Sequence, residues 1–184
     1  PIVAMPSPPT PLPSLLDFEG LLSFYLAFHS DATNQAIHVA FIPAIAWSLL
    51  VGVSRIPGVP AALLLSYTAY YTYLNAPLGI TWGATLGTGL FVSSMTFAKN
   101  EPASAKIALG VHVASWIAQF IGHGVFERRA PSLFTGFLHS FLAAPFFVFV
   151  ECAFKLGMLP ELHKRVRARA DKIRSGLDAA RKKK

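Results

Sequence analysis

Residues 103–126 read ASAKIALGVHVASWIAQFIGHGVF, 24 residues in which Lys106 is the only Lys, Arg, Asp or Glu. A helix needs about 20 predominantly apolar residues, each rising about 1.5 Å, to cross the hydrocarbon core of a bilayer. This stretch meets that requirement. We therefore predict that it crosses a membrane, and that the rest of the fold is arranged around such helices.

Four further apolar stretches accompany this one, at residues 37–53, 59–74, 78–98 and 133–156. The stretches at 78–98 and 133–156 are long enough to span a bilayer, and the other two are short. Proline with polar or glycine residues marks the breaks between them, in RIPG (55–58), NAP (75–77), KNEP (99–102) and RRAP (128–131). The predicted fold is all-α, a transmembrane bundle of about four to five membrane helices without internal repeats.

The N-terminal part predicts two further segments. Residues 15–29 have a helix-compatible pattern with Asp17 and Glu19 near its start, where negative charge is favourable, and we expect an amphipathic helix. Residues 1–13 are rich in proline and lack a basic region followed by an apolar one. They are predicted to be a disordered or polyproline-like leader, and not a cleavable signal peptide.

Composition and charge support a membrane protein with a basic tail. The chain is 53% hydrophobic and 14% charged, with a mean hydropathy of +0.49, outside the range of ordinary soluble domains. Residues 155–184 contain eleven Lys or Arg against three Asp or Glu. No aromatic residues are interleaved with these charges, so nucleic-acid binding is not expected. We interpret residues 159–184 as a cytosolic segment attracted to anionic lipid headgroups, following a membrane domain at 14–158.

Polar residues inside membrane helices are costly and usually mark function. Within the stretch at 103–126, spacings of four, three and four place four residues along one helix face: His112, Trp116, Gln119 and His123. Glu127 continues this face one turn further. The single cysteine, Cys152, excludes a disulfide framework or a thiolate metal site within one chain.

A second polar cluster precedes the stretch at 37–53. On a continuous helix, His29 and His38 would lie on opposite sides, because nine residues turn about 900°. Residues 30–34, SDATN, favour helix caps and turns, so a break there lets His29 fold back beside His38. Asp31 or Asn34 then either fixes an imidazole tautomer by a hydrogen bond or caps a helix.

Topology brings the two clusters together. If the chain crosses the membrane four times between His38 and His123, both residues lie at the same membrane face, with His29 and Glu127 beside them. His112 lies eleven residues before His123, about 16 Å along a straight helix, too far for both to bind one ion at about 2.1 Å. Either the helix is distorted near Gly110, Gly122 or Gly124, or a second metal is bound, or one histidine has another role.

Three motifs, in order along the chain, carry a resemblance to a known family. They are Phe24-Tyr25-x3-His29-x-Asp31-x2-Asn34-x3-His38-x4-Pro43, Trp116-x2-Gln119-Phe120-Ile121-Gly122-His123-x2-Phe126-Glu127-x3-Pro131 and Ala144-Pro145-Phe146-Phe147-x3-Glu151. Over roughly residues 15–156 the chain resembles the fungal, plant and bacterial membrane family of the yeast 2-hydroxy-palmitic acid dioxygenase. The leader, the basic tail and His139 lie outside the resemblance.

The resemblance implies an Fe(II)-dependent α-oxidation at the endoplasmic reticulum membrane. Such an enzyme uses O2 to shorten a 2-hydroxy fatty acid by one carbon, in the breakdown of phytosphingosine. The family's essential histidines match His29, His38, His112 and His123 of this sequence. Imidazoles suit iron, and a 2-hydroxy acid can chelate it while leaving a position for O2.

Other roles are compatible with the same residues. We expect the acyl chain to lie between the apolar helices and Arg128 or Arg129 to pair with the substrate carboxylate. Asp31, Asn34, Gln119 and Glu127 either support the ligands or cap and connect helices. The alternative functions are a non-enzymatic lipid-binding or membrane-shaping protein, and a small metal or proton transporter.

Overall fold

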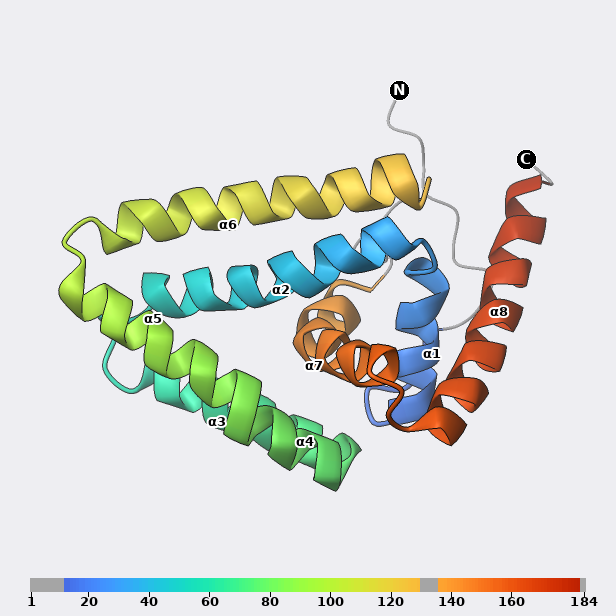
Figure 1. Cartoon of the computed structure of the whole chain (residues 1–184), viewed down its shortest axis with the longest axis horizontal. Helices are drawn as coiled ribbons and strands as arrows, with labels where there is room; N and C mark the ends of the chain where they lie inside the picture. The colour runs from blue at the N-terminus through green and yellow to red at the C-terminus, as the bar shows by residue number, and fades with distance from the viewer. Residues whose placement is uncertain (1–11, 130–135, 183–184) are drawn as a thin grey trace.

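The computed structural model describes residues 12–129 and 136–182, and within these ranges it contains helices and no strand (Figure 1). The helices are α1 (Phe18–Phe28), α2 (Ala32–Gly52), α3 (Val59–Leu74), α4 (Ala76–Trp82), the π-helical turn η1 (Gly83–Gly87), α5 (Thr88–Asn100), α6 (Ser104–Ile121), the π-helical turn η2 (Gly122–Phe126), α7 (Phe137–Lys155) and α8 (Pro160–Lys182). The all-α prediction is confirmed. Most of the predicted leader lies outside the described residues.

The break between α1 and α2 lies where the sequence predicts it. The Asp17 carboxylate accepts a hydrogen bond from the Gly20 N–H at 2.9 Å and caps the start of α1. Asp31 caps α2 in the same way, accepting from the N–H groups of Thr33 at 2.8 Å and Asn34 at 3.0 Å. Each cap satisfies donors that a helix start leaves free, so the chain ends one helix and begins the next within a few residues.

Helices α2 and α6 lie side by side and run in opposite directions, so that the start of α2 meets the end of α6 (Figure 1). Helices α3, α4 and α5 form the connection between them. Gly122 allows the close approach, because a Cβ at this position would overlap the Asn34 side-chain amide. The arrangement brings residues near position 34 against residues near position 122, as the predicted topology requires.

By length and composition, three helices in the described parts of the chain can cross a membrane: Ala32–Gly52, Ser104–Phe126 and Phe137–Lys155. This is fewer than the predicted four to five. The stretch at 37–53 becomes long enough because its helix begins at Ala32, whereas α3 has 16 residues. The stretch at 78–98 belongs to a continuous helical run but does not meet the same hydropathy criterion.

The outer face of α6 is apolar and exposed, as expected of a helix against lipid. Its exposed large apolar side chains are Ile107, Leu109, Val113, Ile117, Phe120 and Ile121. In a soluble protein a face of this size would be covered or would promote association. The structure thus agrees with a helical membrane bundle.

Helix α1 differs from the amphipathic helix that the sequence predicts. Ten of its eleven residues, from Phe18 to Phe28, are buried. Helices α7 and α8 pack against it, and Figure 1 shows α8 running along its outer side. The charges that suggested a solvated face lie at its start, where Asp17 pairs with Arg169 and Glu19 with Arg165. Helix α1 is therefore part of the core.

The basic C-terminal segment is a helix docked on the protein. Arg129, just after the π-helical turn, forms an ion pair with Asp178 of α8. This contact places α8 at the same end of the molecule as the end of α6. Five crossings in succession would have separated Arg129 from the tail, so α7 does not carry the chain to the opposite end. In Figure 1, α7 runs mostly along the line of sight, across α2 and α6.

Candidate metal centre

Three histidines from three separate elements meet in the interior. His29 follows α1, His38 lies in the second turn of α2, and His123 lies in the π-helical turn. One ring nitrogen from each can be chosen so that all three lie within 4.8 Å of one another, and all three side chains are buried. Three imidazole nitrogens at this separation can bind one metal ion.

Main-chain carbonyl groups set the orientation of two of these rings. His29 Nδ1 lies 2.7 Å from the carbonyl oxygen of Tyr25, and His38 Nδ1 lies 2.9 Å from that of Asn34. A carbonyl oxygen only accepts, so each Nδ1 carries the hydrogen, and each Nε2 has a lone pair for a metal. Of the two roles that the sequence allows for Asp31, the structure shows the cap of α2. The main-chain carbonyl group of Asn34 orients His38.

The free nitrogens of the cluster lack protein partners. His29 Nε2 and His123 Nδ1 are buried and have no hydrogen-bond partner. Buried polar atoms without a partner are rare because each costs about 1–3 kcal/mol. Burial, followed by the neighbouring His38 and His123, lowers the pKa of His29 well below its usual value. A neutral His29 is the form that binds a metal.

The π-helical turn provides the distortion that the glycines suggest. Gly122 and Gly124 flank His123 within η2, and the N–H of Glu127 donates to the carbonyl oxygen of Gly122 at 3.0 Å, one residue further than in an α-helix. π-helical turns are common at functional sites. Here the distortion lies at His123 itself, well beyond His112.

Glu127 connects the segments that carry the three histidines. Its Oε2 accepts hydrogen bonds from the N–H groups of Ser30 at 3.0 Å and Asp31 at 2.9 Å, and from Asn34 Nδ2 at 3.2 Å. Its Oε1 accepts from Ser30 Oγ at 2.7 Å and Arg174 Nη1 at 2.5 Å. Burial raises the pKa of Glu127, but the hydrogen bonds outweigh burial and lower it to about 2. Glu127 is an ionised connector and not a fourth ligand of the cluster.

A cavity of about 180 Å³ adjoins the cluster. Its lining includes His29, His38 and His123 together with apolar residues such as Ile42, Leu64 and Phe141. Among the described residues that line it there is no Lys, Arg, Asp or Glu. An apolar cavity beside three imidazoles suits a ligand that has one polar end and an apolar body.

His112 does not belong to the cluster. Its Nδ1 lies 2.9 Å from Ser48 Oγ, and its Nε2 accepts a hydrogen bond from Trp116 Nε1 at 3.0 Å. Ser48 Oγ donates its own hydrogen to the carbonyl oxygen of Ile45, so it accepts from His112 Nδ1. Both ring nitrogens of His112 are engaged with protein groups. The arrangement leaves His112 as a connection between α2 and α6.

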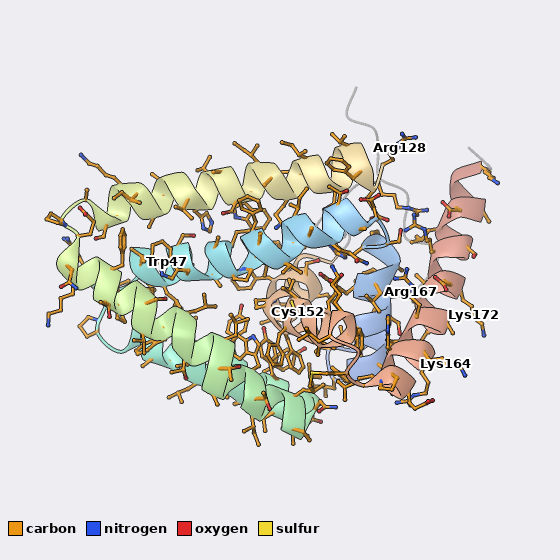
Figure 2. All side chains as sticks on the ribbon, viewed as in Figure 1. Trp47, Arg128, Cys152, Lys164, Arg167 and Lys172 are labelled. Atoms are coloured by element: carbon orange, nitrogen blue, oxygen red, sulfur yellow. The ribbon has the colours of Figure 1, made fainter. Side chains whose placement is uncertain are left out.

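The other predicted site residues lie in different surroundings. Arg129 pairs with Asp178, and neither Arg128 nor Arg129 lines the cavity, so the structure does not support them as partners of a bound carboxylate. Figure 2 shows Arg128 at the end of α6, at the edge of the molecule. Gln119 does line the cavity, one turn before His123, and its buried Nε2 has no hydrogen-bond partner.

Sequence reasoning missed two contributors to the site. The Tyr25 ring stacks on His29 with centroids 4.0 Å apart, and its hydroxyl donates to Glu151 at 3.0 Å. The four-residue spacing of Tyr25 and His29 on a helix was a usable signal for this contact. Arg174 lies 47 residues from Glu127, and no local pattern in the sequence links them.

Comparison with known proteins gives two matches. The family model described as "2-hydroxy-palmitic acid dioxygenase Mpo1-like" matches residues 15–156. The 2-hydroxy-palmitic acid dioxygenase MPO1 of Saccharomyces cerevisiae is 33% identical over 153 residues, which cover 80% of this chain and 86% of the yeast protein. No solved structure matches the chain.

Proposed function

The chain belongs to the Mpo1-like family, and from that premise we propose that it is a non-haem iron dioxygenase that shortens 2-hydroxy fatty acids by one carbon. The observation that carries the proposal is the buried cluster of His29, His38 and His123, whose free nitrogens face one another beside an apolar cavity. A purely structural protein gives no reason for this cavity, and product formation distinguishes the dioxygenase from a transporter.

The donor atoms fit iron. Imidazole nitrogen binds iron, copper and zinc, but zinc has no redox chemistry, which a dioxygenase needs. Three neutral imidazoles leave the ion's positive charge uncompensated in a buried site, so an anionic substrate is favoured there. Fe(II) held in this way would supply open coordination positions at which the 2-hydroxy acid and O2 react.

The protein's part in the reaction is to bind and orient the acid. We assign the acyl chain to the apolar cavity, where burial of each methylene contributes about 0.8 kcal/mol. Gln119 Nε2 is the group that we assign to the substrate carboxylate in place of Arg128 or Arg129, because it is an unpartnered donor in the cavity lining. The apolar lining also excludes bulk water from the reacting groups.

The proposed reaction balances without an added reductant. A 2-hydroxy acid and one O2 give the acid that is one carbon shorter, CO2 and water. The bond between the carboxyl carbon and C2 breaks, C2 becomes the new carboxyl carbon, and O2 accepts the four electrons that the two carbons lose. The products therefore identify the reaction without ambiguity.

We further propose the endoplasmic reticulum membrane as the location and phytosphingosine breakdown as the source of the substrate. Three helices suited to a bilayer and an apolar face on α6 support membrane residence. A substrate with a long acyl chain partitions into the same bilayer.

Product analysis tests the proposal. The purified protein is loaded with Fe(II) without oxygen and then given O2 and 2-hydroxypalmitic acid. We expect a fatty acid with one carbon fewer, in a one-to-one ratio with O2 consumed and CO2 released, and no product from protein loaded with Zn²⁺. Full activity without iron, or no shortened acid from iron-loaded protein, contradicts the proposal.

A further inference from the structure

Helix α8 reaches the metal centre although it lies beyond residues 15–156, the part that the family model matches. Arg174 Nη1 donates a hydrogen bond to Glu127 Oε1 at 2.5 Å. The Glu127 side chain is fully buried, and that of Arg174 is 30% exposed. A charged side chain from a basic surface helix is thus in direct contact with a buried carboxylate of the centre.

Glu127 transmits this contact to two of the histidine-bearing segments. Its hydrogen bonds to Ser30, Asp31 and Asn34 hold the turn between His29 and His38. Glu127 also follows directly after the π-helical turn. Its N–H group donates to the carbonyl oxygen of Gly122, and this hydrogen bond closes the turn that carries His123. A shift of Glu127 would therefore move the ligands relative to one another.

We propose that Arg174 is a positioning residue of the metal centre, whose guanidinium holds the ionised Glu127 carboxylate in the place where it joins the turn at 30–34 to the turn at 122–126. The inference rests on the proposed function only in taking the three histidines as metal ligands. It gives the basic tail a structural part in the site, in addition to any contact with lipid headgroups.

Charge explains why an arginine is needed. Removing one partner of a buried ion pair destabilises the protein, because it leaves a buried charge without compensation. Arg174 is also placed by its helix, because Arg165 and Arg169 of α8 form ion pairs with Glu19 and Asp17 of α1. These outer pairs are exposed and contribute little individually. The pair between Arg174 and Glu127 is the one that reaches the interior.

The test measures Fe(II) affinity directly, without oxygen, by competition with a chromogenic chelator. Replacing groups that support metal ligands commonly lowers affinity by about 10- to 100-fold. We expect the Kd of Arg174→Met for Fe(II) to be raised by at least about 10-fold, with helix content unchanged by circular dichroism.

Two matched controls lie on the same helix. Lys172→Met removes one positive charge from the outer face of α8, where Figure 2 shows Lys172 pointing away from α1. Arg165→Met removes an exposed ion pair with Glu19 and tests docking of α8 as such. Both are expected to bind Fe(II) within about two-fold of the wild type, because neither touches Glu127.

A double variant separates charge from general damage. In Glu127→Gln alone, the amide has two possible orientations. In one, its NH2 group faces the Arg174 guanidinium, which is also a donor; in the other, it no longer accepts the hydrogen bonds that residues 30–34 donate. In Glu127→Gln with Arg174→Met, the amide oxygen accepts from Ser30, Asp31 and Asn34, and no buried charge is left unpaired. We expect the double variant to bind Fe(II) more tightly than either single variant.

The outcomes are distinguishable. A wild-type protein that binds no Fe(II) overturns the proposed function. A wild type that binds Fe(II), with Arg174→Met at the same Kd, overturns the role of Arg174 alone. If Arg174→Met does not fold, the Kd of the double variant for Fe(II) is compared with that of Glu127→Gln. A double variant that binds Fe(II) no more tightly than Glu127→Gln contradicts the role of Arg174.

Discussion

Two kinds of support orient the ligands at the scale of single residues. His29 and His38 donate to main-chain carbonyl groups four residues earlier, so the helices themselves set the ring positions. His123 instead depends on a π-helical turn and has an unpartnered Nδ1. Side-chain changes near His29 and His38 leave these two main-chain acceptors in place, whereas changes at the π-helical turn alter the backbone that carries His123.

Gln119 gives a test of how the acid is held. In Gln119→Leu we expect KM for 2-hydroxypalmitic acid to rise by about 10-fold or more, since a hydrogen bond to a charged group contributes about 1.5–3 kcal/mol. Iron content should stay at the wild-type level, because Gln119 is not a ligand. Steady-state kinetics with parallel metal analysis measures both.

Gln119→Glu is the companion variant. It keeps the shape of the side chain but places a second negative charge beside the substrate carboxylate, so KM should rise further than in Gln119→Leu. If both variants keep the wild-type KM, the carboxylate binds elsewhere, and the assignment of Gln119 is wrong.

The sequence predicted the candidate ligands well where a polar residue in an apolar segment was the signal. His29, His38 and His123 lie together, as the spacing and topology suggested. His112 gives the same signal, but its partner Ser48 lies 64 residues away, and a pattern along one helix does not reveal such a contact. A histidine that hydrogen-bonds to distant protein groups and a histidine that binds a metal have the same pattern in the sequence.

At the scale of elements, the contact between α2 and the turn after α6 is decisive. Gly122 faces the Asn34 side chain, which is fully buried and also donates to Glu127. The absence of a Cβ at Gly122 lets the turn that carries His123 approach the helix that carries His38. Packing at this one position therefore controls the distance between two proposed ligands.

Gly122→Ala should destabilise the protein and weaken metal binding. The new methyl group overlaps the Asn34 amide, and overpacking of this kind costs about 1–3 kcal/mol. Thermal unfolding in detergent, with and without Fe(II), measures the effect. We expect a lower Tm and a smaller rise of Tm on adding Fe(II) than in the wild type.

Gly110→Ala is the matched control on the same helix. Nothing lies within 4 Å of a Cβ at Gly110, and alanine favours a helix more than glycine does. Its Tm should equal or slightly exceed that of the wild type. A loss of stability in Gly110→Ala as large as in Gly122→Ala would mean that the contact with Asn34 is not the cause.

Element boundaries followed from proline, glycine and capping residues, and the breaks lie close to the predicted positions. The environment of the elements was less predictable. Asp17 and Glu19 at the start of α1 suggest a surface helix, yet α7 and α8 bury it, and arginines of α8 more than 140 residues later pair with both acids. The periodicity of a helix predicts which of its faces is apolar, but it does not predict which other element packs against the polar face.

At the scale of the whole molecule, the basic helix α8 lies near the end of α6, whereas Arg55, Lys99 and Lys106 lie near the opposite ends of α2 and α6. Arg129 pairs with Asp178 of α8 just after the turn that carries His123, and Figure 1 shows the C-terminal part of α8 near the end of α6. The other ends of α2 and α6 lie at the opposite side of the molecule. If α2 and α6 cross the bilayer, the positive-inside rule places α8 and the centre at the cytosolic face.

Accessibility of single cysteines tests this orientation. In a Cys152→Ala background, Lys172→Cys should react with an impermeant thiol reagent from the cytosolic side of sealed vesicles, and Asn100→Cys only from the other side. Both positions are exposed in the structure. Labelling of both from the same side would mean that α2 and α6 do not cross the membrane.

The arrangement of the whole molecule was the least predictable level. Counting apolar stretches predicts four to five membrane helices, more than the three in the described residues that are long and apolar enough. It also does not predict how α7 packs on the other helices, because that depends on contacts between distant segments. Helix α8 forms ion pairs with Asp17 and Glu19 at the start of α1 and with Glu127 after α6, two segments that lie far from it in the sequence. These partners come together only in the folded chain.

Metal analysis of single histidine variants tests the central claim most directly. Wild-type protein and His112→Ala, purified and loaded with Fe(II) under the same conditions, should each retain about one iron per chain, whereas His29→Ala, His38→Ala and His123→Ala should retain little. Undiminished iron in any of these three variants, or a loss in His112→Ala equal to theirs, would contradict a metal centre built by the three buried histidines.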